Sequence, residues 1–255
     1  MNQTTEERGH FHVDQMFGCG SATLIKYDNK YFLLTAKHVI NNNITKPYQN
    51  ESPFWVALNS KSTWNSLDDF LMPRKAWNIH EVINRNDQCF DSVNIEDICL
   101  IELFSPMPNL EPDFFLDFGK YKGIDKSQFF NGQLLIANRY PFKRNFFEFE
   151  SIGDFTHSTQ VQRHSIPGSC IVSDNEIKVY FSTDTDVTHE DVNGMSGGVI
   201  CNVEQKANQV KYAGMIVSAG NNKCGFIPSY LVYEAVTQYQ SCSHEIIDPA
   251  DSINL

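Results

Sequence analysis

The sequence predicts an all-β protein made of short strands. Short apolar runs recur along the chain and are separated by turn residues, a spacing that is typical of β-barrels and β-sandwiches. Only residues 228–236 have a helical pattern, with a proline near the start and apolar positions at helical spacing. The 255 residues suit one domain or two closely packed barrels. These observations leave barrel and sandwich architectures open.

Polar turns and proline-rich segments separate the predicted elements. Residues 15–40 are expected to form two strands joined by the polar turn 27–30, and the Asn- and Pro-rich segment 41–53 is expected to be a loop. Prolines in residues 105–112 break any element and predict a linker between two halves. Further strands are expected at residues 54–58, 77–83, 97–103, 134–140, 146–152, 177–181, 198–203 and 212–218.

The stretch around Ser196 carries the strongest functional signal. Ser196 lies between Gly194 and the pair Gly197-Gly198, and an apolar run follows at once. Because glycine accepts backbone angles that other residues resist, such a turn can hold Oγ clear of the backbone. It can also aim the amides of Gly194 and Ser196 at one point, as an oxyanion site requires. On its own, the stretch is equally consistent with a glycine-rich hairpin turn.

Two other stretches supply partners for a serine nucleophile. An apolar run ends in Thr-Ala-Lys-His at residues 35–38, and Asp97 opens another apolar run. A serine hydroxyl is a weak nucleophile until a base takes its proton, and a carboxylate that fixes the tautomer of the base helps it to do so. The order His38, Asp97, Ser196 therefore predicts a catalytic triad. Asp91 is the competing aspartate, but it lies outside an apolar run.

Together these motifs resemble those of the chymotrypsin-like serine peptidases. Residues 35–38 are similar to the family's Thr-Ala-x-His, residues 97–101 to its Asp-apolar-x-Leu-apolar, and residues 194–198 to its Gly-x-Ser-Gly-Gly. The order of the three motifs is also the family's order, which differs from that of other hydrolase folds. Flanking strand-like runs extend the resemblance over residues 17–239.

The resemblance implies a fold and a division of the chain. The fold is two six-stranded antiparallel β-barrels with the active site between them, plus a C-terminal helix. His38 and Asp97 would come from the first barrel and Ser196 from the second. The expected parts are an N-terminal tail (1–15), a first barrel (16–104), a linker (105–127), a second barrel with the helix (128–240) and a C-terminal tail (241–255).

The function implied is that of a serine endopeptidase that works through an acyl-enzyme. Ser196 would attack a peptide carbonyl, and the substrate backbone would pair as an added strand with Val217, Ser218, Ala219 and Gly220. The expected partners are a protein or peptide substrate and a regulatory protein that gates the enzyme. Two other functions stay open, which are a non-catalytic peptide-binding module with a protease fold and an esterase that uses the same triad.

A specificity pocket is suggested by the acidic residues upstream of the serine. In the resembled family, the residue six places before the nucleophile lies at the base of the primary pocket, and here that residue is Glu190, followed by Asp191. A carboxylate there would favour a lysine or arginine side chain of the substrate. The same acidic run is also consistent with a solvated loop.

Composition excludes several other classes of protein. A net charge of −11 argues against a general nucleic-acid binder, which needs a basic face. No apolar run is long enough to cross a bilayer or to act as a signal peptide. The seven cysteines are odd in number, and Val39 stands where secreted family members carry a bridged cysteine. We therefore expect a cytoplasmic protein without disulfides.

No cofactor or metal is predicted. The sequence holds no phosphate-binding loop, dinucleotide glycine fingerprint or HExxH motif. His10 and His12 could suggest a metal pair, but no further ligands follow at useful spacing.

Overall fold

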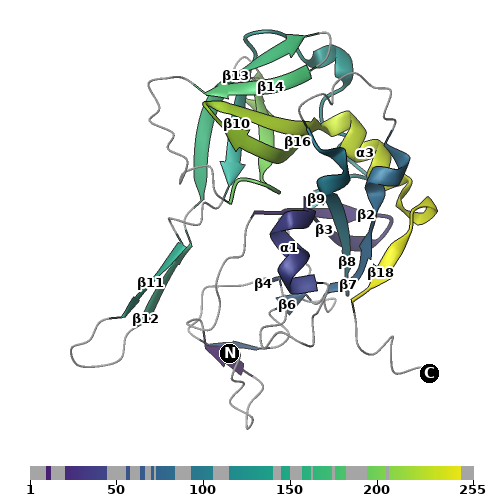
Figure 1. Cartoon of the computed structure of the whole chain (residues 1–255), viewed down its shortest axis with the longest axis vertical. Helices are drawn as coiled ribbons and strands as arrows, with labels where there is room; N and C mark the ends of the chain where they lie inside the picture. The colour runs from purple at the N-terminus through teal and green to yellow at the C-terminus, as the bar shows by residue number, and fades with distance from the viewer. Residues whose placement is uncertain are drawn as a thin grey trace.

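The computed structural model confirms the predicted β class. The structure describes residues 10–12, 21–44, 56–57, 64–66, 70–71, 73–83, 93–105, 115–139, 145–149, 157–161, 163–173, 176–181, 194–204 and 207–247. These residues form a closed six-stranded barrel, a six-stranded sheet and three two-stranded sheets (Figure 1).

The second half of the chain builds the closed barrel. Its strands are antiparallel, and every second residue faces the interior, as in β13, where Ile166, Gly168 and Cys170 are buried and their neighbours are not. The strands, in order around the barrel, are β10 (Leu134–Arg139), β13 (His164–Ser173), β14 (Glu176–Phe181), β17 (Lys223–Pro228), β16 (Gln209–Gly220) and β15 (Val199–Glu204). The predicted barrel in this half is confirmed.

The first half forms a sheet. The strands, from one edge to the other, are β18 (His244–Ile246), β7 (Pro73–Trp77), β8 (Ile98–Leu103), β3 (Lys30–Ala36), β2 (Thr23–Tyr27) and β9 (Leu116–Asp117). Asp28 and Asn29 have positive φ and form the tight turn between β2 and β3, as expected for residues 27–30. In the described residues this sheet is open at β18 and β9. The closed barrel that was expected for residues 16–104 is therefore not seen in the described residues.

Three two-stranded sheets make up the remaining described strands, and two local predictions are corrected. The two-stranded sheets pair β1 (His10–His12) with β5 (Trp64–Ser66), β4 (Val56–Ala57) with β6 (Phe70–Leu71), and β11 (Asn145–Phe149) with β12 (His157–Val161). The strand predicted at 77–83 is wrong, because β7 ends at Trp77 and a 3-10 helix, η3 (Ile79–Val82), follows. The loop predicted at 41–53 is wrong at its start, because helix α1 (Lys37–Ile44) runs through residue 44.

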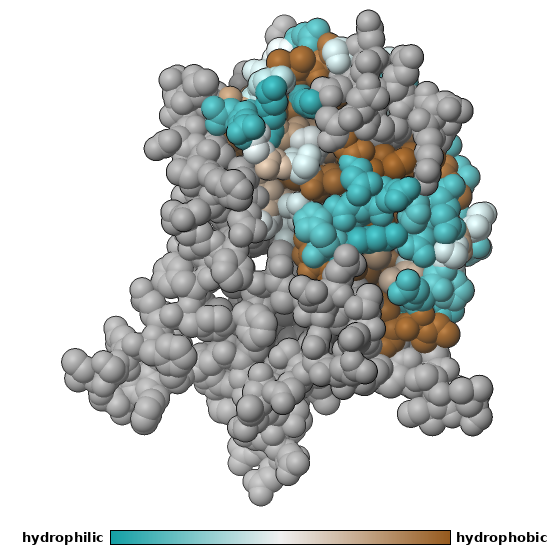
Figure 2. All heavy atoms as spheres, viewed as in Figure 1, coloured by the Kyte–Doolittle hydropathy of each residue, from teal (hydrophilic) through white to brown (hydrophobic). Residues whose placement is uncertain are grey.

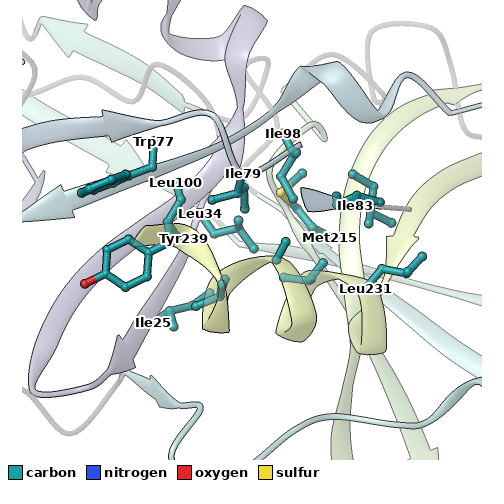
Figure 3. Packing of buried hydrophobic residues seen from close by; sticks show 14 of the residues in the cluster. Ile25, Leu34, Trp77, Ile79, Ile83, Ile98, Leu100, Met215, Leu231 and Tyr239 are labelled. Carbon is teal, nitrogen blue, oxygen red and sulfur yellow. The ribbon is translucent and has the colours of Figure 1, made fainter. Parts of the chain in front are cut away.

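One hydrophobic core joins the sheet to the barrel. Helix α3 (Ser229–Thr237) follows β17 and buries Leu231, Val232, Ala235 and Val236, which confirms the predicted C-terminal helix. It packs between Ile25, Leu34 and Leu100 of the sheet and Met215 of β16 (Figure 3). Because side chains of both halves belong to one cluster, neither half can shift without opening this core.

The residues that follow α3 pack against the first sheet and the neighbouring η3. Tyr239, which is buried, stacks edge-on against Phe32 and Trp77 with ring centroids 5.1 and 4.9 Å apart. Each such aromatic pair contributes about 0.5–1.5 kcal/mol beyond the area that it buries. Ser243 then donates from both N and Oγ to Glu81 of η3, and strand β18 pairs with β7. Strand β18 lies within the segment expected as a C-terminal tail.

The face shown in Figure 2 is mixed in character. Hydrophilic residues form a band across its right-hand half, and hydrophobic residues appear above and below that band. No helix in the described part of the chain is long and apolar enough to cross a membrane.

The described cysteines form no disulfide with one another. They are Cys99, Cys170, Cys201, Cys224 and Cys242, and all but Cys201 are buried. Cys19 and Cys89 lie outside the described residues, and the absence of disulfides stays a prediction for the whole chain. Burial raises the pKa of the Cys99 and Cys170 thiols from 9.0 to about 12.

We expect stability to fall in mild alkali because of these two thiols. Both stay neutral in the folded protein up to about pH 12, whereas in the unfolded chain they ionise near pH 9. Their contribution to stability is therefore intact below pH 9 and is lost as the pH rises from 9 towards 12, with a loss on the order of 1 kcal/mol for each thiol by pH 10. Urea unfolding at pH 8 and pH 10 should show this loss, and Cys99→Ala and Cys170→Ala should each reduce it. An unchanged pH dependence in both variants would contradict the assignment.

Candidate active site

The pairing of two strands brings His38 and Asp97 together. Strand β3 ends at Ala36, and His38 lies in the first turn of α1. Ala36 pairs with Ile98, the first residue of β8, so Asp97 is held next to the start of the helix. Asp97 ends the 3-10 helix η4 (Ile95–Asp97), which the side chain of Asn94 caps by accepting from the amide of Glu96 at 3.1 Å.

Asp97 holds His38 at two points. Its Oδ1 accepts from the backbone amide of His38 at 3.0 Å, and its Oδ2 lies 2.6 Å from Nδ1 of the imidazole. The first contact satisfies one of the amides that a helix leaves unpaired in its first turn. The Asp97 side chain is 14% exposed and that of His38 is 53% exposed. The carboxylate is therefore largely shielded, while the imidazole reaches solvent.

This contact sets the protonation pattern of the neutral imidazole. An ionised carboxylate can only accept hydrogen bonds, so the proton between Oδ2 and Nδ1 belongs to the ring. Nε2 of His38 then carries a lone pair and can accept a proton. A histidine held in this way has the properties of a general base.

Ser196 lies in a tight turn that precedes β15. The amide of Gly198 donates to the carbonyl of Met195 at 2.9 Å, and Gly197 has a φ of +84°. A turn with positive φ at its third residue is of type II and requires glycine there. The amide of Gly197 also donates to the carbonyl of Ile216 at 2.8 Å, which fixes the turn to β16.

The turn is docked on the sheet beside the strand that leads to His38. Ser21, just before β2, donates from Oγ to the carbonyl of Gly194 at 2.7 Å. Thr35 of β3 donates from Oγ1 to the carbonyl of Ser21 at 2.9 Å. A Cβ on Gly197 would collide with the carbonyl oxygen of Ser21 and lie 2.5 Å from Thr35 Oγ1. The three residues of the predicted triad thus come from one junction between the two halves.

In this structure the Ser196 hydroxyl donates to the carbonyl of Val217 at 2.9 Å. Of the predicted triad, the structure therefore shows the His38–Asp97 contact, and the serine hydroxyl is bonded elsewhere. The backbone amides of Gly194 and Ser196 make no hydrogen bond within the described chain, so both remain able to bind an oxyanion.

Strand β16 continues past this turn with one side uncovered. Strand β15 pairs with β16 only as far as Met215, and a bulge between Ile216 and Ser218 leaves Val217 out of the ladder with β17. Beyond the bulge, no described strand pairs with the side of β16 that faces away from β17. We call this side, over residues 217–220, the open edge.

Hairpin geometry identifies which groups reach the open edge. Asn221 and Asn222 have positive φ, so Gly220 and Lys223 flank a two-residue turn and form a hydrogen-bonded pair. Because hydrogen-bonding directions alternate along a strand, the N–H and C=O of Ala219 point away from β17. The open edge therefore presents the carbonyl of Val217 and both backbone groups of Ala219.

The predicted pocket residues, Glu190 and Asp191, lie outside the described residues. On the facing strand, the space beside Gly225 holds Ser218 Oγ and Val93, since a Cβ there would lie 2.6 Å from Ser218 Oγ and 3.1 Å from Val93 Cγ2. In the described residues, no group of three or more His, Cys, Asp or Glu side chains could hold a metal ion.

Comparisons with protein-family models and with curated proteins find no match to this chain.

We expect Gly197→Ala to disrupt the turn around Ser196. The added Cβ collides with the Ser21 carbonyl, and alanine at positive φ is strained by about 1–3 kcal/mol. The turn should relax by reversing the Ser196–Gly197 peptide, which breaks the Gly197 bond to Ile216. Thermal unfolding and turnover should both suffer. Gly132→Ala is a matched control, because Gly132 also has positive φ (83°) but has no atom near its Cβ position. Equal effects at the two sites would show that backbone strain alone, and not the collision, is responsible.

Proposed function

We propose that this chain is a serine endopeptidase that uses a His38–Asp97–Ser196 triad. The observation that carries the proposal is the two-point contact of Asp97 with His38, at the junction where the Ser196 turn docks. Asp97 binds both the amide and Nδ1 of His38, which is more than a surface ion pair needs and which orients the ring. The proposal includes a chymotrypsin-like fold, in which the first sheet is the counterpart of that family's first barrel.

The hydroxyl of Ser196 has to turn from Val217 to His38 before it can react. The proposal requires this movement to be a rotation about the Ser196 side-chain bond, because hydrogen bonds at Gly197 and Gly198 fix the backbone of the turn. An extended peptide at the open edge offers an N–H to the Val217 carbonyl and takes the place of the hydroxyl there. Substrate binding would in this way release the nucleophile.

The reaction then proceeds through an acyl-enzyme. Ser196 Oγ attacks the peptide carbonyl while Nε2 of His38 accepts the hydroxyl proton, and the amides of Gly194 and Ser196 bind the oxyanion. The C–N bond breaks as His38 returns that proton to the leaving amine. Water attacks the ester with His38 again as the base, and Ser196 regains its proton as the acid product leaves.

The open edge favours a peptide over a small ester as the substrate. Residues 217–220 present backbone groups in the alternating pattern that an added β-strand needs. The Val217 carbonyl and the Ala219 backbone would pair with substrate backbone groups next to the scissile bond. A protein or peptide substrate is therefore part of the proposal, and a gating protein partner remains a hypothesis without a site.

Covalent labelling tests the proposal directly. Purified protein should react with a fluorophosphonate probe, and Ser196→Ala should abolish the labelling. Ser169→Ala is a matched control, because Ser169 is an exposed serine on β13. Peptide mapping should place the probe on Ser196.

The outcomes separate the three functions. Labelling at Ser196 together with cleavage of a peptide library supports the endopeptidase. Labelling with hydrolysis of p-nitrophenyl acetate but no peptide cleavage indicates an esterase. Unchanged labelling of the Ser196→Ala protein, or none in the wild type, would reject the triad and leave the peptide-binding module.

A further inference from the structure

Ser21 connects the two halves of the chain at the nucleophile turn. It is 1% exposed, and it lies 173 positions from Gly194, to whose carbonyl its hydroxyl donates. Its own carbonyl accepts the hydroxyl of Thr35, which is equally buried. The same carbonyl packs against Gly197. One residue therefore contacts the turn on both sides of Ser196.

The Gly194 carbonyl is a sensitive point of that turn. Gly194 has a φ of +85°, and glycine gives little intrinsic resistance to rotation of the adjoining peptide. The Gly194–Met195 peptide lies between the two amides that would bind the oxyanion, so its orientation sets the angle between them. The Ser21 hydroxyl holds this peptide by its oxygen at 2.7 Å.

We propose that Ser21 is a positioning residue that aligns the amides of Gly194 and Ser196 for the oxyanion. The inference rests on the proposed function, since it assigns a role within the same site. Ser21 acts only through the turn and touches no reacting atom. Thr35 supports it by fixing the backbone of Ser21 through the 2.9 Å hydrogen bond.

Alignment of this kind acts on the transition state more than on substrate binding. The negative oxygen forms only after attack, so a misaligned amide weakens stabilisation of the transition state and leaves the pairing at the open edge intact. Loss of one oxyanion donor in other hydrolases costs about 10²–10³ in kcat. A donor that is tilted but present should cost less, and we expect about 10- to 100-fold for Ser21→Ala.

The experiment compares wild type, Ser21→Ala, Ser21→Thr and the exposed-site control Ser169→Ala. With a fluorogenic peptide that the wild type cleaves, Ser21→Ala should lower kcat about 10- to 100-fold and change KM by less than about threefold. A peptide aldehyde, whose adduct carries the oxyanion, should bind more weakly by a similar factor. Ser21→Thr keeps the hydroxyl and should recover most of the rate, and Ser169→Ala should match the wild type.

A second measurement does not depend on activity. Ser21→Ala should speed hydrogen–deuterium exchange at the amides of Gly197 and Gly198, which the turn protects through bonds to Ile216 and Met195. The inference is overturned if exchange there is unchanged, if KM rises while kcat holds, or if folded Ser21→Thr is as slow as Ser21→Ala. Absence of labelling in the wild type would instead remove the proposed function, and faster exchange would then leave Ser21 as a residue that orders the turn alone.

Discussion

Replacing either His38 or Ser196 by alanine is expected to lower kcat by about a million-fold, and replacing both should cost little more. In the proposed mechanism the two side chains act in one step, because the hydroxyl attacks only when the imidazole takes its proton. Once either is absent, the other has nothing left to contribute. The residual rate comes from the oxyanion amides and from substrate binding, which both variants keep.

The measurement is turnover of a fluorogenic peptide by the two single variants and the double variant, with Ser169→Ala as the control for handling and fold. His38 is half exposed and Ser196 lies in a turn, so neither change should disturb the core. A double variant that is slower than the singles by the product of their effects would show that the residues act independently, and the triad would then be rejected.

Asp97→Asn should have the next largest effect, a loss of about 10⁴ in kcat with the fold preserved. Asparagine has nearly the shape of aspartate, but its amide nitrogen donates. If that nitrogen faces Nδ1, the imidazole must place its proton on Nε2, and the base is lost. If the asparagine side chain is flipped, its amide nitrogen faces the backbone N–H of His38. Both groups are donors, so the hydrogen bond that Asp97 accepts there is lost.

The matched control is Glu96→Gln, which removes one negative charge from the same 3-10 turn at an exposed position. It should leave kcat within about twofold, as is usual for an exposed charge. Similar losses in both variants would indicate a general electrostatic effect, and the specific role of Asp97 would be wrong.

Part of the candidate site could be predicted from the sequence, because three of its residues lie in short local motifs. His38 follows an apolar strand, Asp97 opens another, and Ser196 is framed by glycines, so each position has a signal within a few neighbours. Ser21 and Thr35 have no such signal. Their importance arises from contacts across 173 and 14 positions, which only the folded chain brings together. The bond between Ser196 and Val217 is likewise a tertiary contact, absent from any local pattern.

The fold was predictable to a similar degree. Strongly apolar runs such as that in β3 gave strands at the expected places. Strand β13 was not predicted, because Pro167 and Gly168 interrupt its pattern, although both are accommodated in the barrel. Helix α1 extends into residues 41–44, where asparagines predict a loop. Strand β18 is short and polar, and its pairing with β7 overrides its weak local preference.

The position of strand β18 in the sequence has a consequence for the order in which the chain folds. The first sheet is completed by residues 244–246, although its other strands all lie before residue 118 (Figure 1). All strands of the barrel precede residue 229, so the barrel can close before the sheet receives its edge strand. The β18–β7 pairing spans more than half of the sequence, and contacts of such long range form slowly. Tyr239 and β18 therefore reach η3, whose neighbour η4 ends with Asp97, late in folding. The edge of the first sheet is thus expected to be the last part of the fold to form.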